Sequence, residues 1–216
     1  MVAKIPQAIH LKMLTAAEAS FAEHGYDGAS LRRITELAGV NLAAVSYHFG
    51  GKKSLYCEVF CRRMRPINES RLRRLGEEER AAAPGPVPLA IVMEVMARPL
   101  FALDGDTLDG GEHFSRILGR SLTEPQPFIA ELLEREFQPA TARFGQAIRR
   151  HVPKLTPEDF LWRLSLVVGA MHHSLATLHN MKALTRGICR DHDRSSALRH
   201  FLELAVPVFA GLGPAA

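Results

Sequence analysis

The chain has little cysteine, no leader-like start and no long uncharged hydrophobic run. Only three of its 216 residues are cysteines, Cys57, Cys61 and Cys189, which are too few and odd in number for a disulfide framework. The first residues lack the apolar core and small-residue cleavage site of a secretory signal. The most apolar stretch, residues 160–178, contains one arginine and two histidines, which disfavours a membrane span. We therefore expect a cytoplasmic protein that does not bind membranes.

Strand-like alternation, internal repeats and the motifs of catalytic or phosphate-binding loops are also missing. With 47% hydrophobic and 23% charged residues, the composition is that of a globular protein. Apolar residues recur at helical spacing, so we expect an all-α fold. After a first helix that ends near His24-Gly25, helices are predicted over about 31–38, 42–48, 52–75, 88–103, 110–122, 126–151, 157–184 and 194–212. Loops are expected at 76–88 and 104–111, and kinks or breaks at Pro99 and Pro139.

Positive charge is concentrated in the first third of the chain. Up to Leu75 there are 12 lysines and arginines against 6 acidic residues, whereas the remainder has 15 basic and 17 acidic residues. Most arginines of the fourth predicted helix are expected either on a solvated face or in a bridge to the body of the chain. The imbalance favours a polyanionic partner for the N-terminal third alone.

Residues 30–49, SLRRITELAGVNLAAVSYHF, have the spacing of a helix-turn-helix, in which two short helices meet across a glycine-containing turn. Ser30 and Asn41 are candidate N-caps, and Leu31, Ile34, Leu37 and Ala38 are predicted to face inward. The small and polar residues of the second helix suit contact with base edges in the major groove. Lys52 follows at the start of the next helix, where a phosphate is favoured. The predicted DNA contacts are Ser30, Arg32, Asn41, Leu42, Ala43, Ser46, Tyr47, His48 and Lys52, with Arg33 as an alternative to Arg32.

The run from Ala16 to Phe60, with Phe21-Ala22-Glu23, Gly25-Tyr26, Ala38-Gly39-Val40 and Tyr47-His48-Phe49 in order, resembles the N-terminal domain of the TetR family of bacterial transcription regulators. The resemblance implies a helix-turn-helix domain over 1–52 and a larger helical effector-binding and dimerisation domain over 53–216. It also implies a ligand-controlled repressor that binds a palindromic operator in double-stranded DNA as a homodimer, without catalytic activity.

The two predicted helices at 157–184 and 194–212 are the best candidates for the dimer interface. They are long and apolar, and small residues allow another helix to approach closely. These residues are Gly169, Ala170, Ala176 and Ala205.

The body of the chain is rich in phenylalanine, leucine and methionine, which are first of all core residues but also suit a long apolar ligand. The segment VNLAAVSYHFGGKKSL and the short segments around Phe114 and Trp162 resemble those of a TetR subgroup that includes fatty-acid-responsive repressors. This second resemblance implies an apolar or amphipathic, acyl-chain-like effector. Candidate ligand contacts are Met96, Phe101, Phe114, Leu118, Trp162 and His173, with Arg116, Arg120 or His173 near a head group.

Several alternatives remain open. Cys57 and Cys61 are either a redox pair or, more simply, structural thiols. His172, His173 and His179 lack the spacing of metal ligands, so neither a metal nor a cofactor is expected. Packed or interface histidines are favoured, and ligand contact by one of the three is the lesser alternative. The rival function is that of an all-α enzyme or a lipid-binding protein with a basic head. A third is an architectural DNA-binding protein without a ligand.

Overall fold

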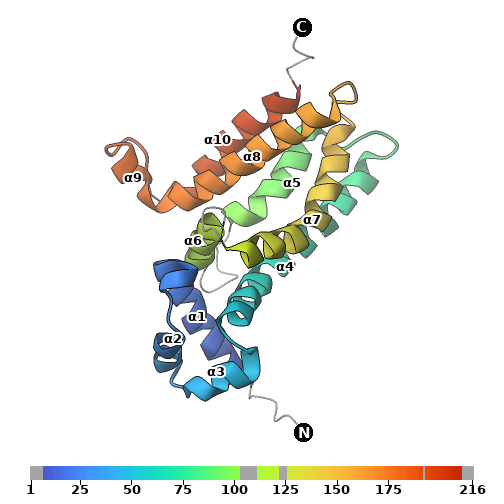
Figure 1. Ribbon diagram of the computed structural model, residues 1–216. Coiled ribbons are helices and arrows are strands. Elements are labelled where there is room, and N and C mark those ends of the chain that lie inside the picture. The colour runs from blue at the N-terminus through green and yellow to red at the C-terminus, as the bar shows by residue number, and fades with distance from the viewer. Residues whose placement is uncertain (1–6, 103–110, 122–125, 192, 211–216) are drawn as a thin grey trace. The chain divides into compact units, whose positions relative to one another are not determined.

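The computed structural model describes residues 7–102, 111–121, 126–191 and 193–210, except for the side chains of residues 44, 111 and 112. Every regular element in this part is helical, which confirms the predicted all-α fold (Figure 1). The predicted connector at 104–111 lies outside the described residues but for Gly111, with which α6 begins. None of the described helices is long and apolar enough to cross a membrane.

The contacts between Cα atoms divide the chain into two compact units. The first comprises residues 1–66 and 104–133, and the second comprises residues 67–103 and 134–216. Two helices, α4 and α7, therefore contribute residues to both units. The predicted functional division after residue 52 concerns which part binds DNA and stays a prediction.

In the first unit, α2 (Leu31–Ala38) packs against both α1 (Gln7–Gly28) and α3 (Leu42–Phe49). The beginning of α4 (Lys52–Ala82) follows, and α6 (Gly111–Ser121) packs against α1. Met13, Ala17, Phe21, Val45 and Phe49 are buried as the helical spacing predicts. The regular part of α1 ends at Gly25 as predicted, because Gly25 is non-helical with φ 69°, and a short further helical stretch follows to Gly28. Leu37 is the exception to the predicted inward face, since it is 62% exposed.

Aromatic rings fill the centre of the first unit. The Tyr56 ring meets those of Phe21 and Phe128 edge to face, with centroids 5.0 and 5.8 Å away. Phe60 meets Phe114 of α6 at 5.5 Å. Aromatic pairs in this geometry add stabilisation to that from burial of their area. They fix the first turns of α4 and hence the point at which the helix-turn-helix ends.

In the second unit, α5 (Leu89–Phe101) packs against α10 (Arg194–Ala210) and α8 (Pro157–Thr177), and α8 also contacts α10. The unit further contains most of α7 (Pro127–Arg149), the short 3-10 helix η1 (Leu178–Asn180) and α9 (Met181–Leu184). α8 thus ends before the predicted residue 184. Neither Pro99 nor Pro139 divides its helix.

The predicted loop at 76–88 is partly wrong, because α4 continues to Ala82. Long-range ion pairs account for the extra helical turns. Glu79 pairs with Arg143 of α7 and lies 4.0 Å from Arg150. The charged residues that made this stretch resemble a loop are therefore the ones that hold its helix in place.

Candidate functional site

The turn between α2 and α3 gives the helix-turn-helix its shape. Gly39 ends α2 in the left-handed conformation, with φ 66° and ψ 36°, which is strained for residues with a side chain. The amide of Val40 donates to the carbonyl of Thr35 at 3.0 Å. The Asn41 side chain then accepts a hydrogen bond from the amide of Ala43 at 2.9 Å, and this confirms the predicted N-cap of α3. Ser30 occupies the N-cap position of α2 without a side-chain cap hydrogen bond.

α3 has one inward side and one exposed side. Val45 and Phe49 are buried, which anchors the helix on the first unit. On the opposite side, small, polar and aromatic side chains lie in the open, with Tyr47 59% and Leu42 46% exposed. The predicted contacts that share this exposed side or its entrance are Asn41, Leu42, Ala43, Ser46 and Tyr47, with His48 half-buried beside them. The Tyr47 and His48 rings meet edge to face, with centroids 4.7 Å apart.

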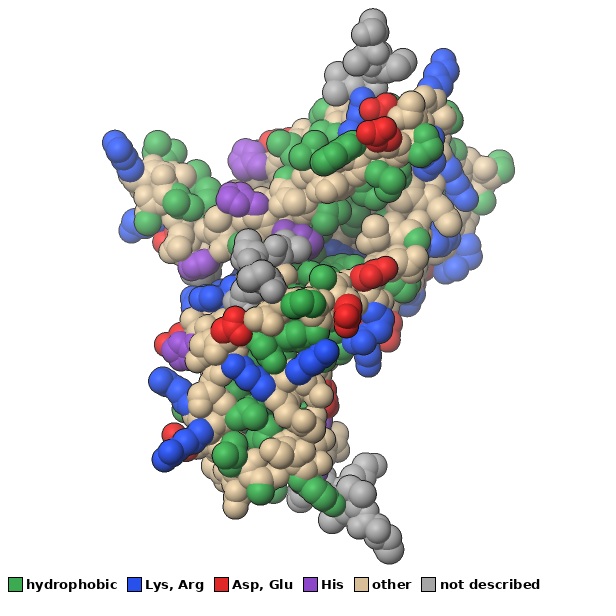
Figure 2. Space-filling view, in the orientation of Figure 1, with side chains coloured by type: hydrophobic (Ala, Val, Ile, Leu, Met, Phe, Trp, Pro, Cys, Tyr) green, Lys and Arg blue, Asp and Glu red, His purple; other side chains and the backbone are tan. Residues whose placement is uncertain are grey.

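The basic residues around α3 differ in the contacts that they already form within the protein. Lys52 donates from Nζ to the carbonyl of Asp27 at 3.1 Å and lies 4.8 Å above the Tyr26 ring. Arg32 is exposed but forms an i,i+4 ion pair with Glu36 at 3.1 Å. Arg33, the sequence's alternative, is exposed and has no ion pair with a described residue. Figure 2 shows basic side chains on the surface over α2. Of these three residues, Arg33 is the most readily available for a phosphate.

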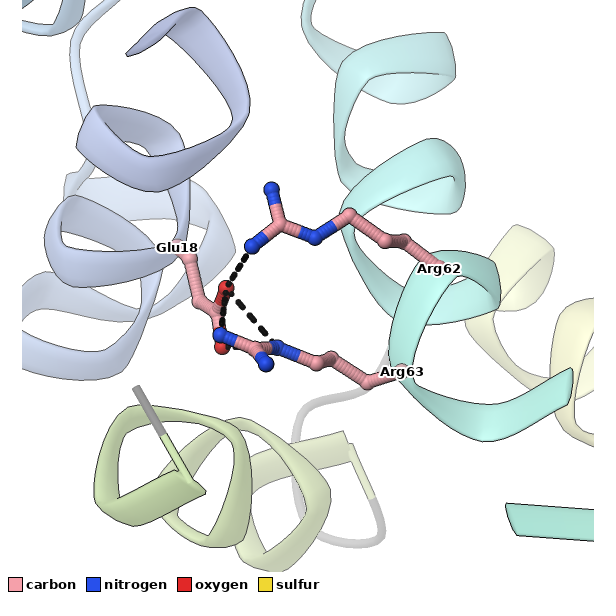
Figure 3. Close-up of polar contacts among 3 residues, drawn as sticks. All are labelled: Glu18, Arg62 and Arg63. Atoms are coloured by element: carbon pink, nitrogen blue, oxygen red, sulfur yellow. Dashed lines mark hydrogen bonds and ion pairs between the residues drawn. The ribbon is translucent and has the colours of Figure 1, made fainter. Parts of the chain in front are cut away.

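A buried ion pair joins α1 to α4 behind this surface (Figure 3). Glu18 is 2% and Arg63 is 3% exposed. The Arg63 guanidinium donates to both carboxylate oxygens at 2.8–3.1 Å, and Arg62 lies 3.5 Å from one of them. Burial raises the pKa of Glu18, and the hydrogen bonds and charge of Arg63 offset part of that rise. Of the two places expected for most arginines of α4, Arg63 does not occupy the solvated face, because it is buried against Glu18 of α1.

The candidate ligand residues do not form one cluster. Phe114 and Leu118 are fully buried in the first unit, whereas Met96 and Phe101 are buried in the second. Phe101 packs against Phe201, with ring centroids 5.9 Å apart. Met96 alone among the six lines a small cavity between α4, α5, α7 and α8.

The two remaining candidates lie at the surface of α8. Trp162 is 64% exposed, so its expected place in the core is wrong. His173 is exposed and lines an open pocket of about 570 Å³ formed with η1, α9 and α10. Of the suggested head-group arginines, Arg120 donates to the carbonyl of Glu23 on α1 at 3.1 Å.

The candidate ligand contacts chosen from the sequence omit two polar residues of the Met96 cavity, Arg71 and His172. Both are buried, at 3% and 5% exposure. Arg71 stands four residues after Ile67 and four before Leu75, both of them buried. This helical spacing places Arg71 on the apolar face of α4, and it is the signal that the sequence offered. His172 packs against Phe137 at 6.0 Å, in line with the expectation of packed histidines.

The residues behind the metal and redox alternatives can be located in the described part of the chain. No group of three potential metal ligands occurs among the described residues. Cys57, Cys61 and Cys189 form no disulfide in the described part of the chain, and Cys61 is buried. Whether Cys57 and Cys61 are structural thiols or a redox pair stays a prediction.

Two protein families match the chain. The family described as "Bacterial regulatory proteins, tetR family" matches residues 13–59, which include α2 and α3. The family described as "Tetracyclin repressor-like, C-terminal domain" matches residues 94–206, just over half of the chain. The chain belongs to the TetR family. It is accordingly a helix-turn-helix regulator and not an enzyme, which removes the enzyme alternative.

Individual relatives agree with this assignment. The transcriptional repressor AcnR of Corynebacterium glutamicum is 44% identical over 45 residues, which are 21% of this chain and 24% of AcnR. The match thus spans about a quarter of that repressor.

Solved structures resemble the whole fold. The fatty acid degradation regulator FadR of Bacillus halodurans has a TM-score of 0.67 at 13% identity, covering 94% of this chain and all of FadR. FadR of Bacillus subtilis in complex with stearoyl-CoA has a TM-score of 0.65 at 14% identity, with the same coverage. A TetR-like regulator of Rhodococcus has a TM-score of 0.67 at 18% identity, covering 97% of this chain and all of the regulator. At these identities the likeness establishes the fold.

Proposed function

We propose that the protein is a transcriptional repressor that places α3 in the major groove of an operator in the bacterial cytoplasm. The observation that carries this proposal is the exposed side of α3, held outward by the Gly39 turn and by burial of Val45 and Phe49. Small residues there allow the helix to approach the bases, and Ser46 and Tyr47 offer hydrogen-bonding groups. Residues 1–52 would then bind DNA and residues 53–216 would bind the effector and the partner subunit.

The roles of the individual side chains follow from the hydrogen bonds and ion pairs that they already form within the protein. Asn41 is occupied by its cap hydrogen bond, so it serves mainly to fix the start of α3. Lys52 has two further N–H donors for a phosphate besides the one given to Asp27. Ser30 and Arg32, at the start of α2, would meet the DNA backbone, and Arg33 would replace Arg32 when that residue stays paired with Glu36.

The effect of Tyr47→Ala tests the placement of α3. We expect operator binding to weaken by about 1–3 kcal/mol, because an exposed ring and hydroxyl that meet DNA are lost. The operator is selected from a random DNA pool, and affinities are measured by fluorescence anisotropy at fixed salt. Leu184→Ala, which alters an equally exposed residue of α9, serves as the control. Unchanged affinity of a folded Tyr47→Ala variant would place the DNA-binding surface elsewhere.

We propose that the partner subunit is a second copy that covers α8 and α10. Leu161, Trp162 and Leu166 of α8 and Leu204 of α10 are each more than half exposed, and large apolar side chains gathered on a surface often mark an interaction site. Figure 2 shows hydrophobic side chains exposed over α8. An added Cβ at Gly169 would meet nothing within 4 Å, so the partner's helix could approach closely there. Ala205, the fourth small residue named from the sequence, is fully buried within the chain and takes no part.

Leu166→Arg is expected to yield a monomer, since an interface that excludes water would bury an unpaired charge. Light scattering coupled to size exclusion measures the mass of the variant. The two helix-turn-helix domains of a dimer would bind two half-sites about 34–36 Å apart, or a multiple of that distance. Because a monomer can occupy only one half-site, it should bind a palindromic operator more weakly. Leu11→Arg, at an exposed residue of α1, is the control. A dimeric Leu166→Arg protein would refute this interface.

We propose that an apolar or amphipathic effector, acyl-chain-like in character, releases the repressor from DNA. Two observations support this. Most of the residues that line the cavity beside Met96 are apolar, among them two methionines and two phenylalanines, and a FadR regulator of the same fold has been solved with stearoyl-CoA. The effector acts only if it binds the DNA-free arrangement more tightly than the DNA-bound one.

A further inference from the structure

The apolar interior of the second unit contains one arginine with incomplete bonding. Arg71 is 3% exposed on the inner face of α4. Burial lowers the pKa of its guanidinium to about 9, so the group still carries its positive charge at neutral pH. Buried charges in proteins are ordinarily paired with an opposite charge. No carboxylate among the described residues forms an ion pair with Arg71.

The hydrogen bonding of Arg71 is incomplete as well. Nη1 donates to Oδ1 of Asn68 at 3.3 Å, and Asn68 in turn donates to the carbonyl of Glu136 at 2.6 Å. Nε and Nη2 of Arg71 are buried without an acceptor in the part of the chain that the structure describes. The edge of the guanidinium that holds two parallel donors suits a carboxylate, and here that edge is left open.

Arg71 lines a cavity of about 30 Å³ that is otherwise mostly apolar. His172 of α8 lines the same cavity, and its Nε2 is likewise buried without a described partner. Burial and the charge of Arg71 lower the pKa of His172 to about 4, so the ring is neutral at pH 7 and offers one N–H donor. The remaining walls include Met96, Phe137 and Met171. Polar groups from two helices therefore converge at one point of an apolar pocket.

We propose that Arg71 and His172 bind the anionic head group of an amphipathic effector whose apolar tail inserts among Met96, Phe137 and Met171. This inference rests on the proposed function, which it refines from an apolar ligand to an anionic one. The head group is a carboxylate, because its two oxygens match Nε and Nη2 of Arg71. A neutral ligand would leave that charge uncompensated.

The size of the cavity sets a condition on binding. A free volume of about 30 Å³ accommodates water molecules but not an acyl chain. The tail therefore enters only if the wall side chains repack, and unbranched methionines do so readily. Ligand binding must in consequence shift the packing of α4 against α5, α7 and α8. The ligand then binds the repacked arrangement more tightly than the original one, and this difference in affinity is what an effector needs in order to favour one conformation.

Calorimetric titration of the full-length protein with four probes of equal chain length tests the proposal. The probes are dodecanoate, dodecanol, dodecyltrimethylammonium and dodecanoyl-CoA. We expect dodecanoate to bind at least about tenfold more tightly than dodecanol, as a charge-assisted hydrogen bond implies, and the cationic probe not to bind. Tighter binding of dodecanoyl-CoA than of dodecanoate would overturn the carboxylate assignment, since the thioester has no free carboxylate at that position.

Three variants attribute the preference to its residues. Arg71→Met should weaken dodecanoate binding at least about tenfold while leaving dodecanol unchanged, and Arg71→Lys should restore part of it. Arg73→Met, at an exposed arginine of the same helix, should change neither. A preference for the anion that survives Arg71→Met, or its absence from the unaltered protein, refutes the proposal.

Operator release is measured separately and distinguishes this inference from the function on which it rests. If another compound releases the DNA and dodecanoate does not bind, the repressor function stands and the Arg71 site is wrong. If dodecanoate binds through Arg71 without releasing the operator, the site stands and the effector role is wrong. His172→Leu gives a second check, since it should weaken dodecanoate more than dodecanol.

Discussion

Glu18→Met is expected to reduce the free energy of unfolding by about 3–5 kcal/mol, the usual consequence of removing one partner from a buried ion pair. The carboxylate accepts three hydrogen bonds at 2.8–3.1 Å from Arg63, and both side chains are almost completely buried. The substitution keeps similar volume but leaves a guanidinium without its anion in the core of the first unit. Urea unfolding followed by circular dichroism measures the loss.

Glu36→Met is the matched control. It breaks the pair with Arg32, whose side chains are 83% and 63% exposed, and pairs of that kind contribute about 0–1 kcal/mol. The double variant Glu18→Met/Arg63→Met should recover much of the lost stability, because no unpaired charge then remains at position 63. A Glu18→Met protein as stable as the control would show that the pair does not hold α1 to α4.

Arg71→Met is expected to have the opposite effect and to stabilise the ligand-free protein by about 1–4 kcal/mol. Burial lowers the pKa of Arg71 from its ordinary value to about 9, so the unfolded chain binds this proton more tightly than the folded one. The folded protein therefore loses stability as the pH falls from the ordinary pKa of arginine to about 9, and the whole of this cost is present at pH 7. Methionine removes the charge and fills the same apolar space.

Thermal and urea unfolding of Arg71→Met, beside Arg73→Met, check this expectation. The control removes an exposed pair with Glu77 and should change stability by no more than about 1 kcal/mol. A gain in stability together with a loss of anion binding would be the pattern of a residue kept for function at the expense of stability. Destabilisation by Arg71→Met would mean that the guanidinium is better satisfied than its bonding indicates.

The helix-turn-helix was predictable because its signals are local. A glycine at the turn, an asparagine at the cap and apolar residues at helical spacing act within about twenty residues, and the structure places Gly39, Asn41 and Val45 as expected. Leu37 was misplaced because α2 has more apolar residues than its small inward face can bury. Whether these residues contact DNA stays a prediction.

The second unit was less predictable, because its determinants lie far apart in the sequence. The last turns of α4 depend on the pairing of Glu79 with Arg143. The place of Trp162 could not be read from periodicity, since α8 has apolar residues on its buried and its exposed sides alike. Phe114 was grouped with Met96 by composition, yet it packs against Phe60 in the other unit. The sequence signal for the polar end of the cavity was the position of Arg71, which shares a helix face with the apolar residues Ile67 and Leu75.

The proline inside α4 has a mechanical consequence. Pro66 has no N–H to give to the carbonyl four residues before it, and the chain passes from the first unit to the second immediately after it. The helix is least stiff at that point, so bending strain concentrates there. Lys52 lies 14 residues away, roughly 21 Å along the axis, and a bend of about 5° would move it by about 2 Å. That displacement is more than half of the roughly 3.4 Å step between stacked bases, so a very small rotation is enough to put a reading helix out of register.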